Sequence, residues 1–564
     1  MHADLQLSLP APVDARYRDA LERLRDLDAV GRLWAHDASL WPDTPGARDL
    51  IATRLDWLEA PTAMAGQLAA IAEAHRKAVE EGVSHVVLLG MGGSSLAPDV
   101  IVRVAGTGAG AGVGAAVGTG RPDLRMLDSV SPAAIRRTFT DMARALVVVA
   151  SKSGSTIEAT VLAAEARRLM EEACGPQWAD RFVAVTDPGT HLAKTSAALG
   201  YRDVWLNPPD IGGRYSALSL FGLVPAGLAG VQVDAILASG AAMAGRCRHT
   251  DLSDNPGAQL GAFLAACAAA GRTALTLVLP QRLEPFGLWI EQLVAESTGK
   301  DGLGILPVLA EPTRTFYGGD RCAVAIDLPG APADTSTLTA LASAGVPIAH
   351  IGLGGTDDLG GEFFRWEFAT AVCGLLMGVN PFDQPDVQGA KTATEALLAE
   401  YGRTRALPVA ERKWTSLPGA VFGSSAATEG DLTAVLTAPD ASYVAILAYA
   451  DPDDVDIARC LGHLRSRLMA RTAVPVTVGY GPRYLHSTGQ LHKGGPAGGR
   501  YLIVTLRPPV DLAIPDAPYS FGTLQLAQAR ADLAALDRAG RHAALVEVTG
   551  DASALESTLA GLLR

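Results

Sequence analysis

Two glycine- and serine-rich segments each follow a short apolar run, in a position that suits the binding of a small anion. The first is GMGGSS at 90–95, which comes directly after HVVLL at 85–89 and before a helical pattern. Glycines let the backbone approach a ligand closely, and N–H groups at a helix start attract negative charge. The segment fails the dinucleotide pattern GxGxxG because Ser95 stands in place of the third glycine. A plain strand-to-helix turn is an equal alternative.

The second segment is SKSGST at 151–156, which follows LVVVA at 146–150. Four hydroxyl groups and one ammonium fall within its six positions. At the start of a helix these groups would make a cradle for a phosphate monoester. An ordinary helix cap, which needs only one hydroxyl, is the alternative. The number of hydroxyls favours phosphate.

Two further segments hold side chains suited to proton transfer. In GGRYS at 212–216, Arg214 could present a guanidinium to developing negative charge, although a surface arginine at a helix start is an even alternative. In EQLVAESTGK at 291–300, Gln292 and Glu296 share one helix face, and the helix is expected to end at Gly299. A partly desolvated Glu296 could act as a general base with a raised pKa. Taken alone, a solvated surface glutamate is the more common case.

Two loops complete the candidate set. NPFDQPDVQGAK at 380–391 predicts a tight turn, with Lys391 at the start of the next helix. HSTGQLHKGG at 486–495 predicts a polar loop between strands that holds His486 and His492. Each segment on its own is consistent with a loop that has no catalytic role.

The elements that position these segments alternate between apolar strands and helices. Strands are predicted at 85–89, 146–150, 182–185, 273–279, 443–449, 474–478, 501–506 and 543–548, and helices at 15–27, 47–58, 155–172, 258–270, 455–470 and 523–540. Fully apolar strands that alternate with helices indicate parallel sheets covered on both faces. The fold class is therefore α/β.

The pattern suggests three stretches of chain. Residues 1–80 are expected to form a helical segment, residues 81–240 a first α/β lobe, and residues 241–564 a second α/β lobe that includes a C-terminal extension. The glycine-rich stretch at 106–120 is expected to be a mobile surface loop. No short-period repeat is visible.

Composition excludes several classes of protein. The chain carries 47 basic and 60 acidic residues, a net charge of −13, which argues against a nucleic-acid partner. The six cysteines form no CxxC pair or Cys/His cluster, so neither a disulfide framework nor a metal site is expected. No apolar stretch is long enough to span a membrane, and no secretory signal is visible at the start. The expectation is a soluble cytoplasmic protein without a membrane partner.

Together, these motifs resemble those of the glucose-6-phosphate isomerase family, in the SIS (sugar isomerase) superfamily. GMGGSS, SKSGST, IGGRYSALSLFG, QLVAESTGK and NPFDQPDVQGAK occur in the family's order over roughly residues 80–395. The resemblance implies two SIS-type lobes, each a mainly parallel sheet flanked by helices. It also implies an aldose–ketose isomerase that acts on a hexose 6-phosphate, without metal or cofactor.

The resemblance also assigns roles to individual residues. It implies that Glu296 shuttles a proton between C1 and C2 through an enediolate, that Arg214 steadies the enediolate, and that Lys391 helps a histidine to open the sugar ring. The residues implied to bind the substrate are Gly93, Ser94, Ser151, Lys152, Ser153, Ser155, Thr156 and Gln292. The chemistry agrees with what these residue types can do, since one positioned base and one cation suffice to move the proton.

The sequence departs from the family at several positions. The family's histidine usually lies between the ESTGK-like and NPFDQ-like segments, but residues 301–380 contain only His350. STGQLHKGG occurs later, so His492 is the first choice and His486 the second. This order is the one expected of the isomerase portion of bacterial transaldolase/glucose-6-phosphate isomerase fusions. Asp386, Gln388 and Gly154 also replace the family's usual Gly, Glu and Phe.

The leading hypothesis is therefore the interconversion of glucose 6-phosphate and fructose 6-phosphate, in glycolysis and gluconeogenesis, by a homodimer. Two alternatives stay open. One is a bifunctional isomerase that also accepts mannose 6-phosphate, and the other is a non-catalytic SIS protein that only binds a sugar phosphate. The presence of Glu296, Arg214 and Lys391 argues against the second, because a sensor needs no base.

Overall fold

The computed structural model describes residues 5–42, 46–106, 121–314, 316–408, 420–427 and 432–562. The chain divides into two compact units. Unit 1 comprises Met1–Met126, Asp141–Thr298 and Ile305–Asp383, and unit 2 comprises Leu127–Thr140, Gly299–Gly304 and Gln384–Arg564. The described strands form three five-stranded sheets, which confirms the α/β class. The low-complexity stretch at 107–120 lies outside the described residues.

The first sheet of unit 1 has the strand order β3-β2-β4-β5-β6. Its strands are β2 (His85–Leu89), β3 (Asp123–Leu127), β4 (Ala145–Ala150), β5 (Phe182–Thr186) and β6 (Asp203–Leu206). β2, β4, β5 and β6 run parallel. β2, β4 and β5 are buried along their whole length, as expected of parallel strands covered on both faces.

The second sheet of unit 1 has the order β1-β10-β9-β7-β8. Its strands are β1 (Leu5–Ser8), β7 (Ala274–Val278), β8 (Leu306–Val308), β9 (Arg321–Asp327) and β10 (Ile348–Gly352). The helical segment expected at 1–80 also contains a strand, because β1 pairs antiparallel with β10 as an edge strand. Four residues with alternating burial are too short a pattern to stand out beside the helices that follow.

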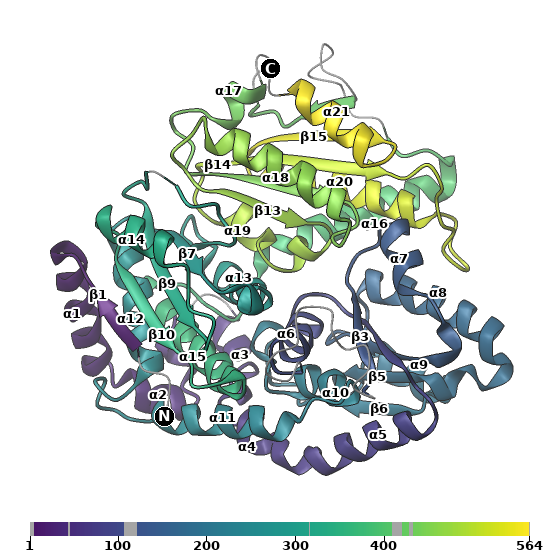
Figure 1. Cartoon of the computed structure of the whole chain (residues 1–564), viewed down its shortest axis with the longest axis horizontal. Helices are drawn as coiled ribbons and strands as arrows, with labels where there is room; N and C mark the ends of the chain where they lie inside the picture. Colours follow the sequence, from purple (N-terminus) through teal and green to yellow (C-terminus); the bar gives the residue numbers. More distant parts are fainter. Residues whose placement is uncertain are drawn as a thin grey trace. The chain divides into compact units, whose positions relative to one another are not determined.

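Helices surround both sheets of unit 1, and most of them contribute residues to one continuous apolar core. They are α1 (Ala11–Asp26), α2 (Ala29–Trp34), α3 (Ala47–Ala52), α4 (Ala60–Ala63), α5 (Leu68–Glu80), α6 (Leu96–Ala105), α8 (Ile157–Cys174), α9 (His191–Leu199), α10 (Leu220–Leu228), α11 (Val233–Arg246), α12 (Pro256–Ala269), α13 (Glu284–Thr298), α14 (Thr335–Ser343) and α15 (Leu359–Met377). α12 and α11 pack on α15, and α13 packs on α6 (Figure 1).

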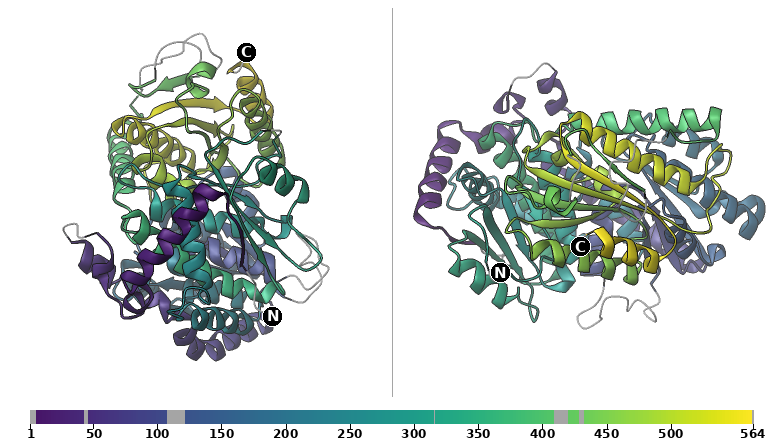
Figure 2. Two further views of the ribbon diagram at one scale, coloured as in Figure 1. Left: turned by 90° about the vertical axis from the view of Figure 1, so that its left-hand side faces the viewer. Right: turned by 90° about the horizontal axis from the view of Figure 1, so that it is seen from above.

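Unit 2 contains the third sheet, with the order β11-β15-β14-β12-β13. Its strands are β11 (Ala420–Gly423), β12 (Tyr443–Tyr449), β13 (Val476–Tyr480), β14 (Gly499–Arg507) and β15 (His542–Thr549), and its helices are α7 (Pro132–Thr138), α16 (Gln388–Thr404), α17 (Leu432–Leu436), α18 (Val455–Met469), α19 (Gly489–Gly494), α20 (Phe521–Arg538) and α21 (Ala552–Leu562). Figure 2 shows helices on both faces of this sheet.

The expectation of one second lobe over 241–564 differs from the structure. The strands after residue 400 pair only with one another, so they form a sheet of their own and do not extend the second sheet. α18 and α21 cover an apolar core that is separate from the core of unit 1. Most predicted strands and helices were located to within a few residues, although the helix expected at 47–58 ends at Ala52. Which strands would pair could not be seen in the sequence.

A short segment from early in the chain also belongs to unit 2. Leu127–Thr140 leaves the end of β3 and carries α7. Arg137 Nη2 donates to Asp451 at 2.8 Å and to Asp453 at 2.7 Å, and Arg136 Nη2 donates to the carbonyl of Asp511 at 2.8 Å. Arg483 Nη2 donates to Asp128 at 2.8 Å. These charge-assisted contacts fix the segment, hereafter the α7 clasp, against the loops that follow β12, β13 and β14.

A search of the described residues found no helix long and apolar enough to cross a membrane.

Candidate active site

The two anion-binding candidates lie at neighbouring strand ends of the first sheet. GMGGSS follows β2 and SKSGST follows β4, and these two strands pair side by side. β3 lies on the other side of β2, so the chain order reverses between β2 and β4. Ligands of open α/β sheets bind at the carboxyl ends of strands at such a reversal. The topology therefore brings the two segments to one place.

Arg214 joins three of the sequence motifs within unit 1. It lies in the short helical turn Gly213–Tyr215, and only 5% of its surface is exposed. Its Nε donates to Ser297 Oγ at 2.8 Å, and its Nη2 donates to the carbonyls of Pro381 at 2.6 Å and Asp383 at 2.8 Å. The GGRYS, ESTGK and NPFDQ segments thus meet at one guanidinium.

Glu296 lies beside this guanidinium, in the last turn of α13 as predicted. Its Oε1 is 3.4 Å from Arg214 Nη1, and Gln292 Nε2 donates to its Oε2 at 3.3 Å. The residue is 8% exposed, so the alternative of a solvated surface glutamate does not hold. A carboxylate and a fixed guanidinium this close can supply a proton acceptor and a charge for a developing oxyanion.

The GMGGSS turn packs directly on the GGRYS turn. A Cβ atom added to Gly93 would lie 1.9 Å from the carbonyl oxygen of Gly213, so only glycine allows this approach. Ser216 Oγ donates to the Gly213 carbonyl at 2.5 Å. Ser94 is buried in the same turn. The close contact links the position of Arg214 to that of the glycine loop.

The hydroxyls of SKSGST form hydrogen bonds within the turn that precedes the 18-residue helix α8. Ser151 Oγ accepts a bond from Gly154 N at 3.1 Å and lies 2.9 Å from Thr156 Oγ1, while Ser155 N donates to Ser153 Oγ at 3.4 Å. Gly154 has φ +65°, and a Cβ there would meet Thr190. The family's usual phenylalanine would therefore be strained at this position.

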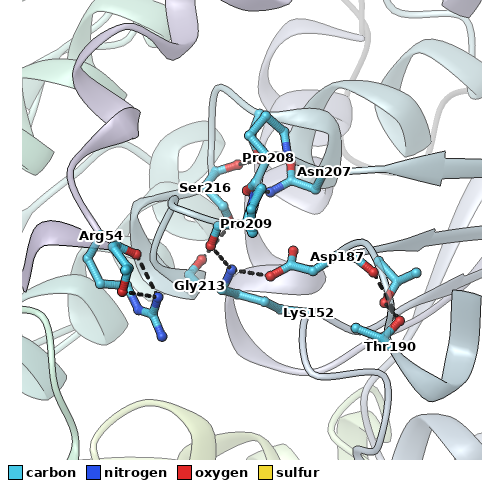
Figure 3. A network of polar contacts seen from close by, with 12 residues as sticks. Arg54, Lys152, Asp187, Thr190, Asn207, Pro208, Pro209, Gly213 and Ser216 are labelled. Carbon is cyan, nitrogen blue, oxygen red and sulfur yellow. Dashed lines mark hydrogen bonds and ion pairs between the residues drawn. The ribbon is translucent and has the colours of Figure 1, made fainter. Parts of the chain in front are cut away.

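Lys152 points into a polar network of its own (Figure 3). Its Nζ forms an ion pair with Asp187 and donates to the carbonyl of Pro209 at 2.8 Å. Burial lowers the pKa of Lys152 and raises the pKa of Asp187. Much of the positive charge of Lys152 is thus balanced by Asp187 in this structure.

Arg54 is a cation that the motif analysis did not single out. Figure 3 shows it beside Gly213, and its guanidinium interacts electrostatically with Lys152 and Asp187. It follows the end of the short helix α3, in the N-terminal segment. No local pattern marks it among the chain's many arginines, so only the fold reveals its place.

The remaining candidates belong to unit 2. Lys391 lies in the first turn of α16 and is exposed. The segment at 486–495 is not the polar loop that was expected, because Gly489–Gly494 forms α19 and Arg483–His486 forms a helical turn. His492 is buried, and His486 is partly exposed. The buried charges of this segment find partners that are remote in sequence.

Two of those remote partners explain how charged and polar groups of the segment can be buried. Lys493 Nζ lies 2.6 Å from Asp532 Oδ1 on α20. Arg541 Nη2 donates to the carbonyls of Lys493 at 2.7 Å and Gly495 at 2.6 Å, which satisfies the C-terminal end of α19. A fully paired charge can be buried where a free one cannot.

Asp386, one of the departures from the family pattern, pairs with this same segment. Gln490 Nε2 donates to Asp386 Oδ2 at 2.6 Å, and Asp386 N donates to Gln490 Oε1 at 2.9 Å. A Cβ at Gly494 would lie 2.1 Å from Asp386 Oδ2. Asp386, Gln490 and Gly494 therefore fit one another as a set.

Comparisons with known proteins find relatives among glucose-6-phosphate isomerases. The family model for phosphoglucose isomerase matches residues 68–304. The glucose-6-phosphate isomerase of Rubrobacter xylanophilus is 31% identical over 448 residues, which cover 70% of this chain and 99% of that protein. A glucose-6-phosphate isomerase structure from Chlamydia trachomatis superposes with a TM-score of 0.51 at 18% identity, covering 70% of this chain and 87% of that one. A hypothetical protein from Thermus thermophilus superposes with a TM-score of 0.58 at 24% identity, covering 70% and 100%.

The parallel α/β sheets together with the family match define the class as sugar-phosphate isomerase. The match covers 99% of the Rubrobacter relative at 31% identity, which identifies one family within this class. The chain belongs to the glucose-6-phosphate isomerase family.

Proposed function

We propose that this protein interconverts D-glucose 6-phosphate and D-fructose 6-phosphate through an enediolate intermediate. The observation that carries the proposal is the 3.4 Å pairing of Glu296 with Arg214, a guanidinium held by the ESTGK and NPFDQ segments. Isomerisation moves one proton between adjacent carbons and develops charge on the adjacent oxygens. A positioned carboxylate and a fixed cation meet these two needs.

The geometry of unit 1 supports a role for each of three residues. Glu296 takes the proton from C2 of the aldose and returns it to C1, and Gln292 orients this carboxylate from one helical turn away. Arg214 Nη1 faces the enediolate oxygens. Because Nε and Nη2 are already bonded to the protein, the guanidinium need not reorganise as charge develops.

The phosphate end of the substrate is assigned to the loops after β2 and β4. Gly93, Ser94, Ser151, Ser153, Ser155 and Thr156 offer N–H and hydroxyl groups there, with Lys152 nearby. Holding the unreactive end of the sugar places C1 and C2 for proton transfer. The ion pair of Lys152 with Asp187 supports an indirect contribution from this lysine.

Ring opening is assigned to Lys391 together with His492, and His486 is the second choice for the histidine. The buried, hydrogen-bonded setting of His492 supports this order, because a fixed imidazole is a better proton carrier than a mobile one. We also propose a homodimer, a cytoplasmic location and correspondence to the isomerase portion of transaldolase fusions, on the strength of the family resemblance. Light scattering of the purified protein tests the first of these.

The test separates proton transfer from ring opening. Glu296→Gln is expected to lower kcat for fructose 6-phosphate about 10²- to 10⁴-fold, because it removes the base. The same variant should still interconvert the α and β anomers of glucose 6-phosphate, which NMR exchange spectroscopy measures without any transfer at C2. Glu284→Gln, an exposed position in the first turn of α13, is the matched control.

A wild-type rate for Glu296→Gln would overturn the assignment of the base. Wild-type protein that binds both sugar phosphates but converts neither would instead indicate a sugar-phosphate sensor. Conversion of mannose 6-phosphate at a similar rate would broaden the substrate class.

A further inference from the structure

His492 lies in a ring of buried tyrosines in unit 2. Only 1% of its surface is exposed, and its ring lies 5.1 Å from Tyr501, 5.9 Å from Tyr443 and 6.4 Å from Tyr484, measured between centroids. Tyr443 projects from β12 and Tyr501 from β14, and these two residues lie on neighbouring parallel strands. The sheet thus fixes both phenol rings against the imidazole.

Three hydrogen bonds link the two phenol hydroxyls to the imidazole and to the main-chain carbonyl of His492. Tyr501 Oη donates to the main-chain carbonyl of His492 at 2.9 Å. The hydroxyls of Tyr443 and Tyr501 are 2.6 Å apart, and Tyr443 Oη is 3.1 Å from His492 Nδ1. A carbonyl only accepts, whereas a hydroxyl has a single hydrogen to donate.

Counting hydrogens decides the direction of each bond. The hydrogen of Tyr501 goes to the carbonyl, so the bond between the two hydroxyls must use the hydrogen of Tyr443. Tyr443 then has no hydrogen left for the imidazole and can only accept from it. Nδ1 must therefore carry the proton of the neutral ring.

We propose that Tyr443 and Tyr501 are positioning residues that hold His492 as the neutral Nδ1–H tautomer, so that Nε2 is its proton acceptor. No residue within STGQLHKGG specifies the tautomer of His492, because both tyrosines come from strands of the third sheet.

The charges around the ring favour the same neutral state. Burial is the main cause that lowers the pKa of His492 well below its ordinary value, and the positive charges of Lys493 and Arg541 lower it further. The nearby carboxylate of Asp532 is already paired with Lys493 and accepts a bond from Tyr484 Oη at 2.7 Å. An imidazolium would therefore be disfavoured at neutral pH.

The tautomer determines whether His492 acts as an acid or as a base in ring opening. This assignment rests on the proposed function. In ring opening the C1–O5 bond breaks, with its electron pair passing to O5, while O1 becomes a carbonyl oxygen. Nε2 takes the proton from the C1 hydroxyl, and the Lys391 ammonium gives a proton to O5. The histidine acts as the base and the lysine as the acid in this direction.

The tautomer is tested directly by ¹⁵N NMR of the full-length protein labelled in its histidine rings. His492→Asn assigns the signals of His492. The wild-type protein at neutral pH should show a protonated Nδ1 and an unprotonated Nε2. An Nε2–H ring or an imidazolium would overturn the proposal.

Two variants test how the tautomer is enforced. Tyr443→Phe removes the acceptor of Nδ1–H, and Tyr501→Phe releases the Tyr443 hydrogen to point at Nδ1, so both should shift His492 toward Nε2–H. Tyr484→Phe removes a buried hydroxyl from the same cluster and should leave the tautomer unchanged, as a matched control. An unchanged tautomer in both test variants would overturn the proposal.

Kinetics then separate this inference from the proposed function. Tyr443→Phe should slow anomer interconversion at least about tenfold, with KM nearly unchanged, because the wrong tautomer presents a hydrogen where a lone pair is needed. A wild-type rate for a Tyr443→Phe protein with altered tautomer would overturn the positioning role. A wild-type rate for His492→Asn would overturn the ring-opening assignment and leave the tautomer standing.

Discussion

At the scale of single residues, Arg214 and His492 show the same principle in two different settings. In each, hydrogen bonds to the surrounding protein fix the orientation of the side chain. Ser297, Pro381 and Asp383 occupy Nε and Nη2 of Arg214, and Nη1 faces Glu296. Tyr443 occupies Nδ1 of His492. Nη1 of Arg214 and Nε2 of His492 are the atoms that we propose to face the substrate.

The buried state of His492 predicts a pH dependence of stability. Its pKa in the folded protein lies well below the value of about 6.5 expected in the unfolded chain. Below pH 6.5 the unfolded chain therefore binds the extra proton while the folded protein resists it. Stability should fall as the pH drops from 6.5, by up to about 1.4 kcal/mol per pH unit from this group.

Urea unfolding of wild-type protein and of His492→Asn, at pH 7 and at pH 5.5, measures this contribution. The asparagine amide can replace the Nδ1–H donor but does not titrate in this range. The loss of stability between the two pH values should be smaller in the variant. An equal loss in both proteins would mean that His492 charges freely in the folded state.

At the scale of elements, short turns and helices are held in place by close contacts with distant parts of the chain. The turns after β2 and before α10 touch at Gly93 and Gly213, whose backbones leave no room for a side chain on Gly93. α19 is held from outside, by Asp532 of α20 and by Arg541 just before β15. In both cases an element of only a few residues depends on partners that are far away in sequence.

Gly93→Ala is expected to lower kcat/KM at least about tenfold, because the added Cβ displaces the turn that carries Arg214. Gly213→Ala is the matched control, since a Cβ at Gly213 would meet no atom within 4 Å. Steady-state kinetics of both variants measure the effect. Equal activity in the two would show that the contact has no role in placing Arg214.

Asp532→Asn should destabilise the protein by about 3–5 kcal/mol, because it leaves the Lys493 ammonium buried without its counter-charge. Chemical denaturation followed by circular dichroism measures the change. The double variant Lys493→Met with Asp532→Leu should recover much of the loss, since replacing a whole buried pair is often tolerated. A double variant no more stable than Asp532→Asn would argue against this account.

At the scale of the whole molecule, the chain builds two units on separate apolar cores and carries a net charge of −13. The excess of acidic residues repels an anionic substrate at long range. Local cations must therefore supply the attraction where the substrate binds, a role that we propose for Arg54, Arg214 and Lys391.

The proposed reaction uses only side chains of this chain to move protons. Dialysis against EDTA is therefore expected to leave kcat within about twofold of its starting value. The coupled assay must be run with a dehydrogenase that is itself indifferent to the chelator. A loss of rate that a divalent cation restores would contradict the scheme.

Much of the local structure could be predicted from the sequence, because apolar runs end sharply. Tyr443–Tyr449 was predicted residue for residue, and Glu296 was correctly placed in the last turn of α13. β1 was missed because an edge strand of four residues has little pattern of its own. The separate third sheet was missed because strand pairing is non-local.

The interior of unit 2 was the hardest part to foresee. HSTGQLHKGG has the composition of an exposed loop, yet His492 and Lys493 are buried. The partners that make this possible, Tyr443, Tyr501 and Asp532, become evident only when β12, β14 and α20 are assembled. No short-range signal around 486–495 contains that information.

The α7 clasp has a consequence for how the protein is made. Asp451 follows its partner Arg137 by 314 residues in the chain. At synthesis rates of about 5–20 residues per second, the partner arrives roughly 15–60 s later. The first sheet can therefore form before the residues that the α7 clasp contacts have been synthesised. Completion of unit 2 must therefore wait until β14 and β15, which follow the clasp by several hundred residues, have been synthesised.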